Sequence, residues 1–178
     1  VTDSDEVAPS LSDGDSTANT VAEDATAGTT VGVKAKGSDG DAGTSFSYAF
    51  ASDGNPDVLF DLNATTGVVT LAGSLDYETA TSHSIKVVGT ATDSNGGSKT
   101  TEETFLINVG NVNDNDPALA AQSIDVLDSI SAGIELADLK DSNTSNDTDR
   151  DGDAIEYSIT AGNENKLFTI NESTGKLS

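Results

Sequence analysis

The chain has 178 residues, 31 of them acidic and 8 basic, and its formal charge is −23. This charge excludes nucleic acid as a partner, because the phosphate backbone would be repelled. The absence of cysteine excludes a disulfide framework, a zinc–thiolate site and thiol catalysis. Self-repulsion also disfavours a compact state, so the composition predicts that high salt or bound divalent cations accompany folding.

An oxygen-rich segment begins the chain and returns 108 residues later. Residues 1–9 read V-T-D-S-D-E-V-A-P, and residues 109–117 read V-G-N-V-N-D-N-D-P. Each copy ends in proline, which fixes φ and removes a backbone donor, so we expect both copies to be extended. A hard cation such as Ca2+ takes about six to eight oxygen ligands from carboxylates, amides and carbonyls. The repeated segment therefore predicts modules in series that are joined through metal ions.

Between the two copies, short runs of apolar residues alternate with polar residues. The alternating positions are Val31, Val33 and Ala35, then Phe46, Tyr48 and Phe50, then Ile85 and Val87, and finally Phe105, Ile107 and Val109. A period of two is typical of strands with one buried face. Turn-forming clusters at residues 52–56, 66–67 and 93–97 separate the runs. Roughly seven short strands in about 100 residues predict an all-β sandwich.

The second half of the chain repeats landmarks of the first. Phe60-Asp-Leu-Asn-Ala-Thr-Thr-Gly67 returns as Phe168-Thr-Ile-Asn-Glu-Ser-Thr-Gly175, again 108 residues later. We therefore expect residues 1–9 to be a linker from a preceding repeat, residues 10–110 a complete repeat, residues 111–117 an interdomain linker, and residues 118–178 the N-terminal part of a second repeat. That part holds only about four or five strands of the pattern, so we expect it to be a fragment boundary or to be completed by strands from another chain.

Six short motifs lie in a fixed order within residues 19–117. They are Val21-Ala-Glu23, Asp39-Gly-Asp41, the element from Phe60 to Gly67, Leu75-Asp76-Tyr77-Glu78, Ala91-Thr92-Asp93 and the 111–117 linker. Together they resemble tandem cadherin repeats of the bacterial kind. The resemblance implies tandem Greek-key β-sandwich repeats, the second incomplete, from a calcium-rigidified adhesin at a bacterial cell surface. Such repeats act as extracellular spacers and in cell–cell or cell–surface adhesion, and they are not enzymes.

The resemblance also implies which oxygens bind calcium. Up to three Ca2+ are expected at the 111–117 junction, with ligands from Glu23, Asp76, Glu78, Asn111, Asn113, Asp114, Asn115, Asp149 and Asp151. A partial site is expected near residues 3–7, from Asp3, Asp5, Glu6, Asp39, Asp41 and Asp93. Asn111 departs from the aspartate usual at its position and removes one charge. The carboxylates at the junction would repel one another without cations, so we expect this site to bind metal.

The expected partners are neighbouring repeats of the same chain, homophilic contacts or surface glycans. A second hypothesis is a calcium-dependent carbohydrate-binding module that accompanies a secreted polysaccharide-degrading enzyme. The chain has no tryptophan and few aromatic residues for a sugar platform, which favours the adhesin. No apolar run reaches the roughly 18 residues of a membrane span, so we expect no direct membrane insertion by these residues.

Three other features have simpler interpretations. Residues 147–153 match the start of an EF-hand loop, but Ser158 stands where the bidentate glutamate belongs. Asn63 and Asn171 fit a glycosylation pattern, yet each precedes Thr-Gly and is expected to cap a β-turn. The single histidine, His83, lies on a predicted strand face, and the paired carboxylates sit in turns, so these patterns do not indicate catalysis.

Overall fold

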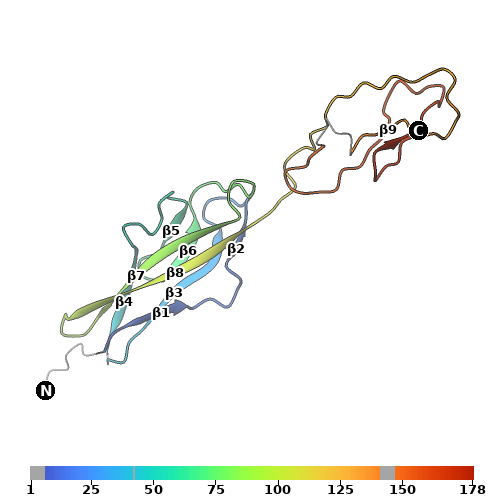
Figure 1. Cartoon of the computed structure of the whole chain (residues 1–178). Coiled ribbons are helices and arrows are strands. Elements are labelled where there is room, and N and C mark those ends of the chain that lie inside the picture. The colour runs from blue at the N-terminus through green and yellow to red at the C-terminus, as the bar shows by residue number, and fades with distance from the viewer. Residues whose placement is uncertain (1–6, 42, 141–146) are drawn as a thin grey trace. The chain divides into compact units, whose positions relative to one another are not determined.

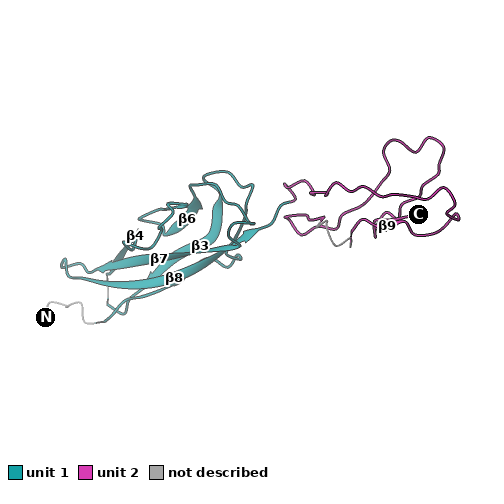
Figure 2. Cartoon of the chain, turned by 45° about the horizontal axis from the view of Figure 1, so that its top comes forward, with its two compact units in different colours: residues 1–112 teal, residues 113–178 magenta. Residues whose placement is uncertain are grey.

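The computed structural model describes residues 7–41, 43–140 and 147–178, and these form strands, turns and irregular loops without a helix (Figure 1). Residue contacts divide the chain into two compact units, residues 1–112 (unit 1) and residues 113–178 (unit 2) (Figure 2). In the part of the chain that is described, no helix has the length and apolar character needed to cross a membrane.

Unit 1 is a β-sandwich of two four-stranded sheets. One sheet has the order β1 (Ser10–Asp13), β3 (Thr30–Ser38), β6 (Val68–Leu71) and β5 (Phe60–Leu62). The other has the order β2 (Thr20–Ala22), β8 (Ser98–Gly110), β7 (Ser82–Thr92) and β4 (Ser45–Phe50). Neighbouring strands are antiparallel except β2 and β8, which pair in parallel. The all-β sandwich expected from the alternating pattern is therefore confirmed for unit 1.

Apolar residues that alternate along the strands form the core between the two sheets. Side chains at most 2% exposed include Val31, Val33, Val69, Leu71, Ile85, Val87 and Ile107. Full burial of such a side chain stabilises the fold by about 1.5–3 kcal/mol. Two predicted inward residues of the edge strand β4, Phe46 and Phe50, are only half-buried and pack against the margin of this core. An edge strand has a neighbour on one side only, which leaves its side chains less covered.

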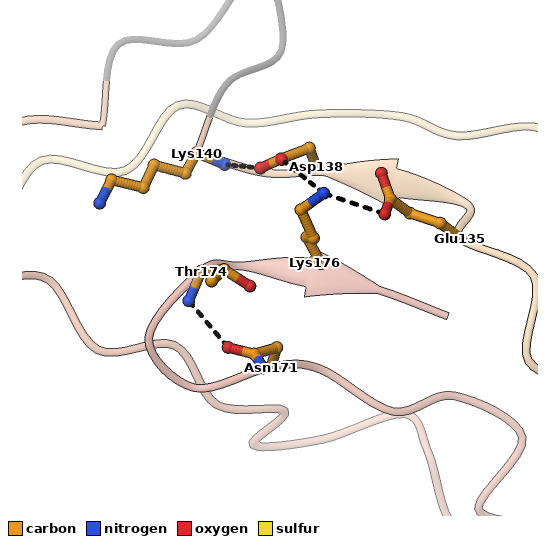
Figure 3. Close-up of polar contacts among 6 residues, drawn as sticks. All are labelled: Glu135, Asp138, Lys140, Asn171, Thr174 and Lys176. Atoms are coloured by element: carbon orange, nitrogen blue, oxygen red, sulfur yellow. Dashed lines mark hydrogen bonds and ion pairs between the residues drawn. The ribbon is translucent and has the colours of Figure 1, made fainter.

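Both asparagines of the Thr-Gly elements cap turns, as the sequence predicts. Asn63 Oδ1 accepts hydrogen bonds from the N–H groups two and three residues later, at 3.0 and 2.9 Å. Asn171 Oδ1 likewise accepts the N–H of Ser173 at 3.2 Å. It also accepts the N–H of Thr174 at 2.9 Å, the bond drawn in Figure 3. These bonds satisfy N–H groups inside the turn, in addition to the backbone bonds that Asn63 and Asn171 make with the following strand, and they fix the chain reversal.

Unit 2 contains fewer strands than its sequence pattern predicts. Its described residues form β9 (Ala137–Asp138) and β10 (Lys176–Leu177), plus isolated bridges at Ala118–Thr148 and Ile170–Leu177. Lys176 on β10 pairs with Glu135 at 3.1 Å and with Asp138 on β9 at 3.6 Å, and these contacts raise the pKa of Lys176 (Figure 3).

The physical reason for this difference is that the 178 residues contain no second copy of the β7–β8 hairpin. In unit 1 that hairpin is the longest paired element and covers one side of the core. Phe168, which corresponds to Phe60 in the repeat, is only half-buried, whereas Phe60 is 2% exposed. Strand segments without hydrogen-bonded neighbours remain irregular.

One loop residue adopts a backbone conformation that its side chain disfavours. Val58 has φ +53° and is 71% exposed, and Lys166, 108 residues later, has the same φ. The left-handed region is especially unfavourable for a β-branched residue. The turn persists because Asn55 Nδ2 donates to Phe60 O at 2.7 Å and Val58 N–H donates to Asn55 O at 3.1 Å.

We expect Val58→Asn to raise the free energy of unfolding of unit 1 by about 1 kcal/mol, because asparagine tolerates this backbone region and the exposed valine loses little packing. Urea denaturation followed by circular dichroism measures the change. Val58→Ala is the control, since it removes the branch and keeps Cβ, and should give a smaller gain. An unfolding free energy that stays constant or falls in Val58→Asn would contradict the prediction.

Candidate metal centre

Glu23 is a buried carboxylate at the end of unit 1 where β2 meets the last residues of β8. Its backbone N–H donates to Gly110 O at 3.0 Å, which continues the β2–β8 pairing, and the residue is 7% exposed. Oε1 accepts the N–H of Val112 at 2.7 Å, and Oε2 accepts the N–H of Tyr77 at 2.6 Å. These two bonds join three segments that are far apart in the sequence, and each oxygen still has a lone pair for a cation.

A second glutamate of unit 1 lies close to Glu23. One carboxylate oxygen of Glu78 lies within 4.8 Å of one of Glu23, and Glu78 Oε1 is buried. Like charges at this separation repel by roughly 3–4 kcal/mol at an effective dielectric constant near 20, unless a cation lies between them. Carboxylate oxygens are the ligands that Ca2+ prefers, so this pair fits a calcium ion.

Asp76 is also a predicted ligand, but both of its carboxylate oxygens bond to a residue of its own turn, whereas the oxygens of Glu23 bond to distant segments. Its Oδ1 accepts the N–H of Thr79 at 2.9 Å, and its Oδ2 accepts the Thr79 hydroxyl at 2.8 Å. The Asp76 side chain therefore caps the turn that carries Glu78. Asn111, the linker position that departs from aspartate, is exposed directly after β8.

The linker residues of unit 2 fold against the loop that contains the second D-x-D motif. Asp151 is 9% exposed and accepts two bonds from Asn115, from the backbone N–H at 2.8 Å and from Nδ2 at 3.0 Å. The same Nδ2 donates to Asp114 Oδ1 at 2.7 Å, and one oxygen of Asp114 lies within 4.8 Å of one of Asp151. Unit 2 thus also holds a close pair of carboxylates.

The neighbouring aspartates of this loop have separate roles. Asp149 Oδ1 accepts the N–H of Asp153 at 3.3 Å, so the Asp149 side chain closes the loop at Gly152, which has φ +82°. Asp153 accepts a hydrogen bond from Asn113 Nδ2. Sequence reasoning did not select Asp153, although its place directly after a D-x-D-G run was a usable signal. No helix flanks this loop among the described residues, unlike an EF-hand.

The opposite end of unit 1 carries the predicted partial site. Asp41 Oδ2 accepts the N–H of Val7 at 3.0 Å, and Asp39 Oδ1 accepts the N–H of Asp41 at 2.8 Å. Among the described residues, Asp39 Oδ2 is buried and has no hydrogen-bond partner. A buried oxygen without a partner is costly, so its position favours a cation ligand. The predicted ligands Asp3, Asp5 and Glu6 lie outside the described residues.

Asp93, assigned to the same partial site, caps the turn between β7 and β8. Its Oδ1 accepts the N–H of Asn95 at 2.7 Å and that of Gly97 at 2.9 Å. Both bonds go to residues of the same turn. Asp93 thus bonds backbone donors two and four residues away, whereas Glu23 bonds donors 54 and 89 residues away.

Comparison with known proteins identifies the repeat. The cadherin domain model matches residues 18–110, slightly more than half of the chain. Cadherin-4 of Caenorhabditis elegans is 31% identical over 133 residues, and human Protocadherin Fat 1 is 33% identical over 162 residues. These alignments cover 72% and 89% of this chain, and the chain spans only 3% of the length of each relative.

Solved structures share the fold. The crystal structure of mouse Cadherin-23 EC22-24 matches with a TM-score of 0.75 and 21% identity, covering 99% of this chain and 55% of that chain. The protocadherin GammaB4 extracellular domain matches with a TM-score of 0.71 and 23% identity, covering 98% of this chain and 28% of that chain. The chain therefore belongs to the cadherin domain family, whose repeats are extracellular, calcium-binding adhesion modules and not enzymes.

Proposed function

We propose that this chain is a calcium-rigidified segment of an extracellular adhesion protein, in which Ca2+ bound around residues 111–117 stiffens the link between successive repeats. The observation that carries the proposal is the bonding of two adjacent linker residues. Val112 donates to buried Glu23 in unit 1, and Asn113 donates to Asp153 in unit 2. Each of these carboxylates thus accepts a hydrogen bond from a linker residue of its own unit.

Charge explains why a cation suits this linker. Each unit holds a pair of carboxylate oxygens within 4.8 Å, Glu23 with Glu78 and Asp114 with Asp151. Bound Ca2+ would supply the positive charge that offsets both pairs, and up to three ions are proposed, with Asn111 and Asn115 as neutral oxygen ligands. Without Ca2+ the carboxylates repel one another, and the linker is free to bend.

The proposed role is that of a spacer and adhesive repeat, with neighbouring repeats and homophilic contacts as partners. The relatives named above are animal cadherins, so the bacterial cell surface inferred from the sequence stays a prediction without support from them. The alternative of a carbohydrate-binding module, and surface glycans as partners, likewise have no support from these relatives. Neither point changes the calcium hypothesis.

Removal of calcium tests the proposal. We expect a chelator to change the sedimentation coefficient, because a freely bending chain has a different friction from a stiff one. It should also lower the melting temperature and expose residues 111–117 to proteases, because repulsion between the carboxylates is no longer offset. Added Ca2+ should restore all three values. Mg2+ is the control, since its small octahedral shell suits these ligands poorly and it should restore little. Identical values with and without chelator would show that the chain is not rigidified by calcium.

A further inference from the structure

Asn63, in the turn between β5 and β6, uses all of its hydrogen-bonding groups in the fold except the side-chain nitrogen. Its backbone N–H donates to Val68 O at 3.0 Å, and its carbonyl oxygen accepts the N–H of Gly67 at 2.9 Å. Oδ1 accepts the N–H groups of Thr65 and Thr66. Two N–H donors require an oxygen, so the orientation of the side-chain amide is fixed. Among the described residues, Nδ2 of Asn63 has no hydrogen-bond partner.

Other asparagines of this loop region use their side-chain nitrogen. Asn55 Nδ2 donates to Phe60 O at 2.7 Å, and Asn163 Nδ2 makes the corresponding bond to Phe168 O, also at 2.7 Å. Asn171 behaves like Asn63, since its Oδ1 caps a turn and its Nδ2 has no partner within the part of the chain that the structure describes. An unused amide nitrogen is therefore specific to the two Thr-Gly turns and is not a general property of asparagine here.

Asn63 also begins an exposed tripeptide, Asn63-Ala64-Thr65. Asparagine followed two residues later by Ser or Thr, with any residue but proline between them, is the acceptor pattern for N-linked glycans in secreted proteins. The cap and a glycan do not compete, because the cap uses Oδ1 whereas a glycan forms on Nδ2. The Thr65 hydroxyl likewise makes no hydrogen bond to the described residues, which leaves it accessible to a glycosylating enzyme.

The surroundings of Asn63 leave room for a bulky polar group. The residue directly follows β5, which is the last strand of the sheet β1-β3-β6-β5. A surface groove beside it is lined by Asp61, Thr66, Val68 and Thr70. The carboxylate and hydroxyl groups of this groove can hydrogen-bond to sugar hydroxyls. A glycan at this turn would also cover the edge of β5, where a strand of another chain would otherwise pair.

We propose that Asn63 is an N-glycosylation site whose acceptor atom is the Nδ2 that the turn cap leaves unbonded. Nδ2 attacks the anomeric carbon of a sugar carried on a lipid diphosphate. A C–N bond forms, the C–O bond to the diphosphate breaks, the nitrogen loses one proton, and the lipid diphosphate leaves. Asn171 has the same arrangement and is expected to be a second acceptor. The modification makes no use of calcium and adds to the proposed function without depending on it.

Site-resolved mass spectrometry of the full chain, secreted from a eukaryotic cell line, tests occupancy. We expect a glycan on Asn63, and its enzymatic release in heavy-oxygen water should convert Asn63 to labelled aspartate. Site resolution is needed because residues 143–148 contain two further N-x-S/T tripeptides. Thr65→Ala should abolish the glycan, whereas Thr66→Ala, the matched control, leaves the tripeptide intact and should keep it. Unmodified Asn63 in the secreted wild type, or equal occupancy in the two variants, would overturn the proposal.

Chain made in a bacterium without glycosylation enzymes tests whether the fold needs the nitrogen. Asn63→Asp keeps the capping oxygen, so at high salt, which screens the added charge, its unfolding equilibrium constant should stay within about twofold of the wild type. Asn63→Ala removes the cap and should raise this constant by about tenfold. Equal destabilisation by both variants would show that the fold requires Nδ2, contrary to the proposal. All variants should keep the response to chelator, so a chain insensitive to chelator refutes the calcium function alone.

Discussion

Glu23→Gln is expected to lower both the calcium affinity of the chain and the stability of unit 1. Glutamine keeps one carbonyl oxygen, but its amide nitrogen must face either Val112 N–H or Tyr77 N–H, which now bond to the two carboxylate oxygens. One buried donor then loses its acceptor, at a cost of about 1–3 kcal/mol. The missing charge should also reduce calcium affinity by about tenfold or more.

Two measurements separate these effects. Urea denaturation in chelator measures stability without metal, and isothermal titration calorimetry measures calcium binding to the folded variant. Asp24→Asn is the matched control, since it removes the same charge from the next residue, whose side chain is exposed. It should change stability and calcium affinity little. If Asp24→Asn and Glu23→Gln had equal effects, a specific role for Glu23 would be excluded.

Gly67→Ala is expected to destabilise unit 1 by about 3 kcal/mol or more. Gly67 has φ +72°, and a Cβ built there would lie 2.0 Å from the Ala35 carbonyl oxygen. The strained backbone contributes about 1–2 kcal/mol, and the overlap with a backbone atom adds about 1–3 kcal/mol. Ala35 cannot move away freely, because its N–H donates to Gly67 O at 2.8 Å and it lies in the buried strand β3.

Gly96→Ala provides the control for this prediction. Gly96 has φ +89° in the turn between β7 and β8, and a Cβ there would meet nothing within 4 Å. It should therefore show only the backbone cost, about 1–2 kcal/mol. Thermal and urea denaturation of both variants give the difference. Equal destabilisation would mean that the close approach of Gly67 to β3 contributes nothing.

The sequence predicted most of unit 1 because its signals are local. Alternation of apolar residues located strands β3, β4, β7 and β8, and Asn63 and Asn171 could be identified as turn caps from their neighbours alone. In residues 118–140 and 147–178, which the structure describes, the same patterns overestimated the number of strands. A strand forms only when a neighbour supplies its hydrogen bonds, and that depends on residues far away in the chain.

The candidate calcium ligands show the same contrast between local signals and contacts made by distant segments. From the sequence, Glu23, Asp76 and Asp93 are equivalent acidic residues in family motifs. The structure separates them, because Asp76 and Asp93 bond within their own turns while Glu23 is buried against Val112 and Tyr77. Which carboxylate caps a turn depends on its nearest backbone donors, but the environment of Glu23 depends on segments 54 and 89 residues away.

Composition, repeat length and motif order by themselves determined that this is an acidic, all-β chain of repeated modules with oxygen-rich linkers. Only the tertiary structure decided that Glu23 and Glu78 form a close pair and that Asp39 keeps a buried oxygen with no hydrogen-bond partner among the described residues. The physical reason is that strand periodicity and turn capping arise within a few residues, whereas burial and charge proximity arise when the β2–β8 pairing and the sandwich bring distant segments together.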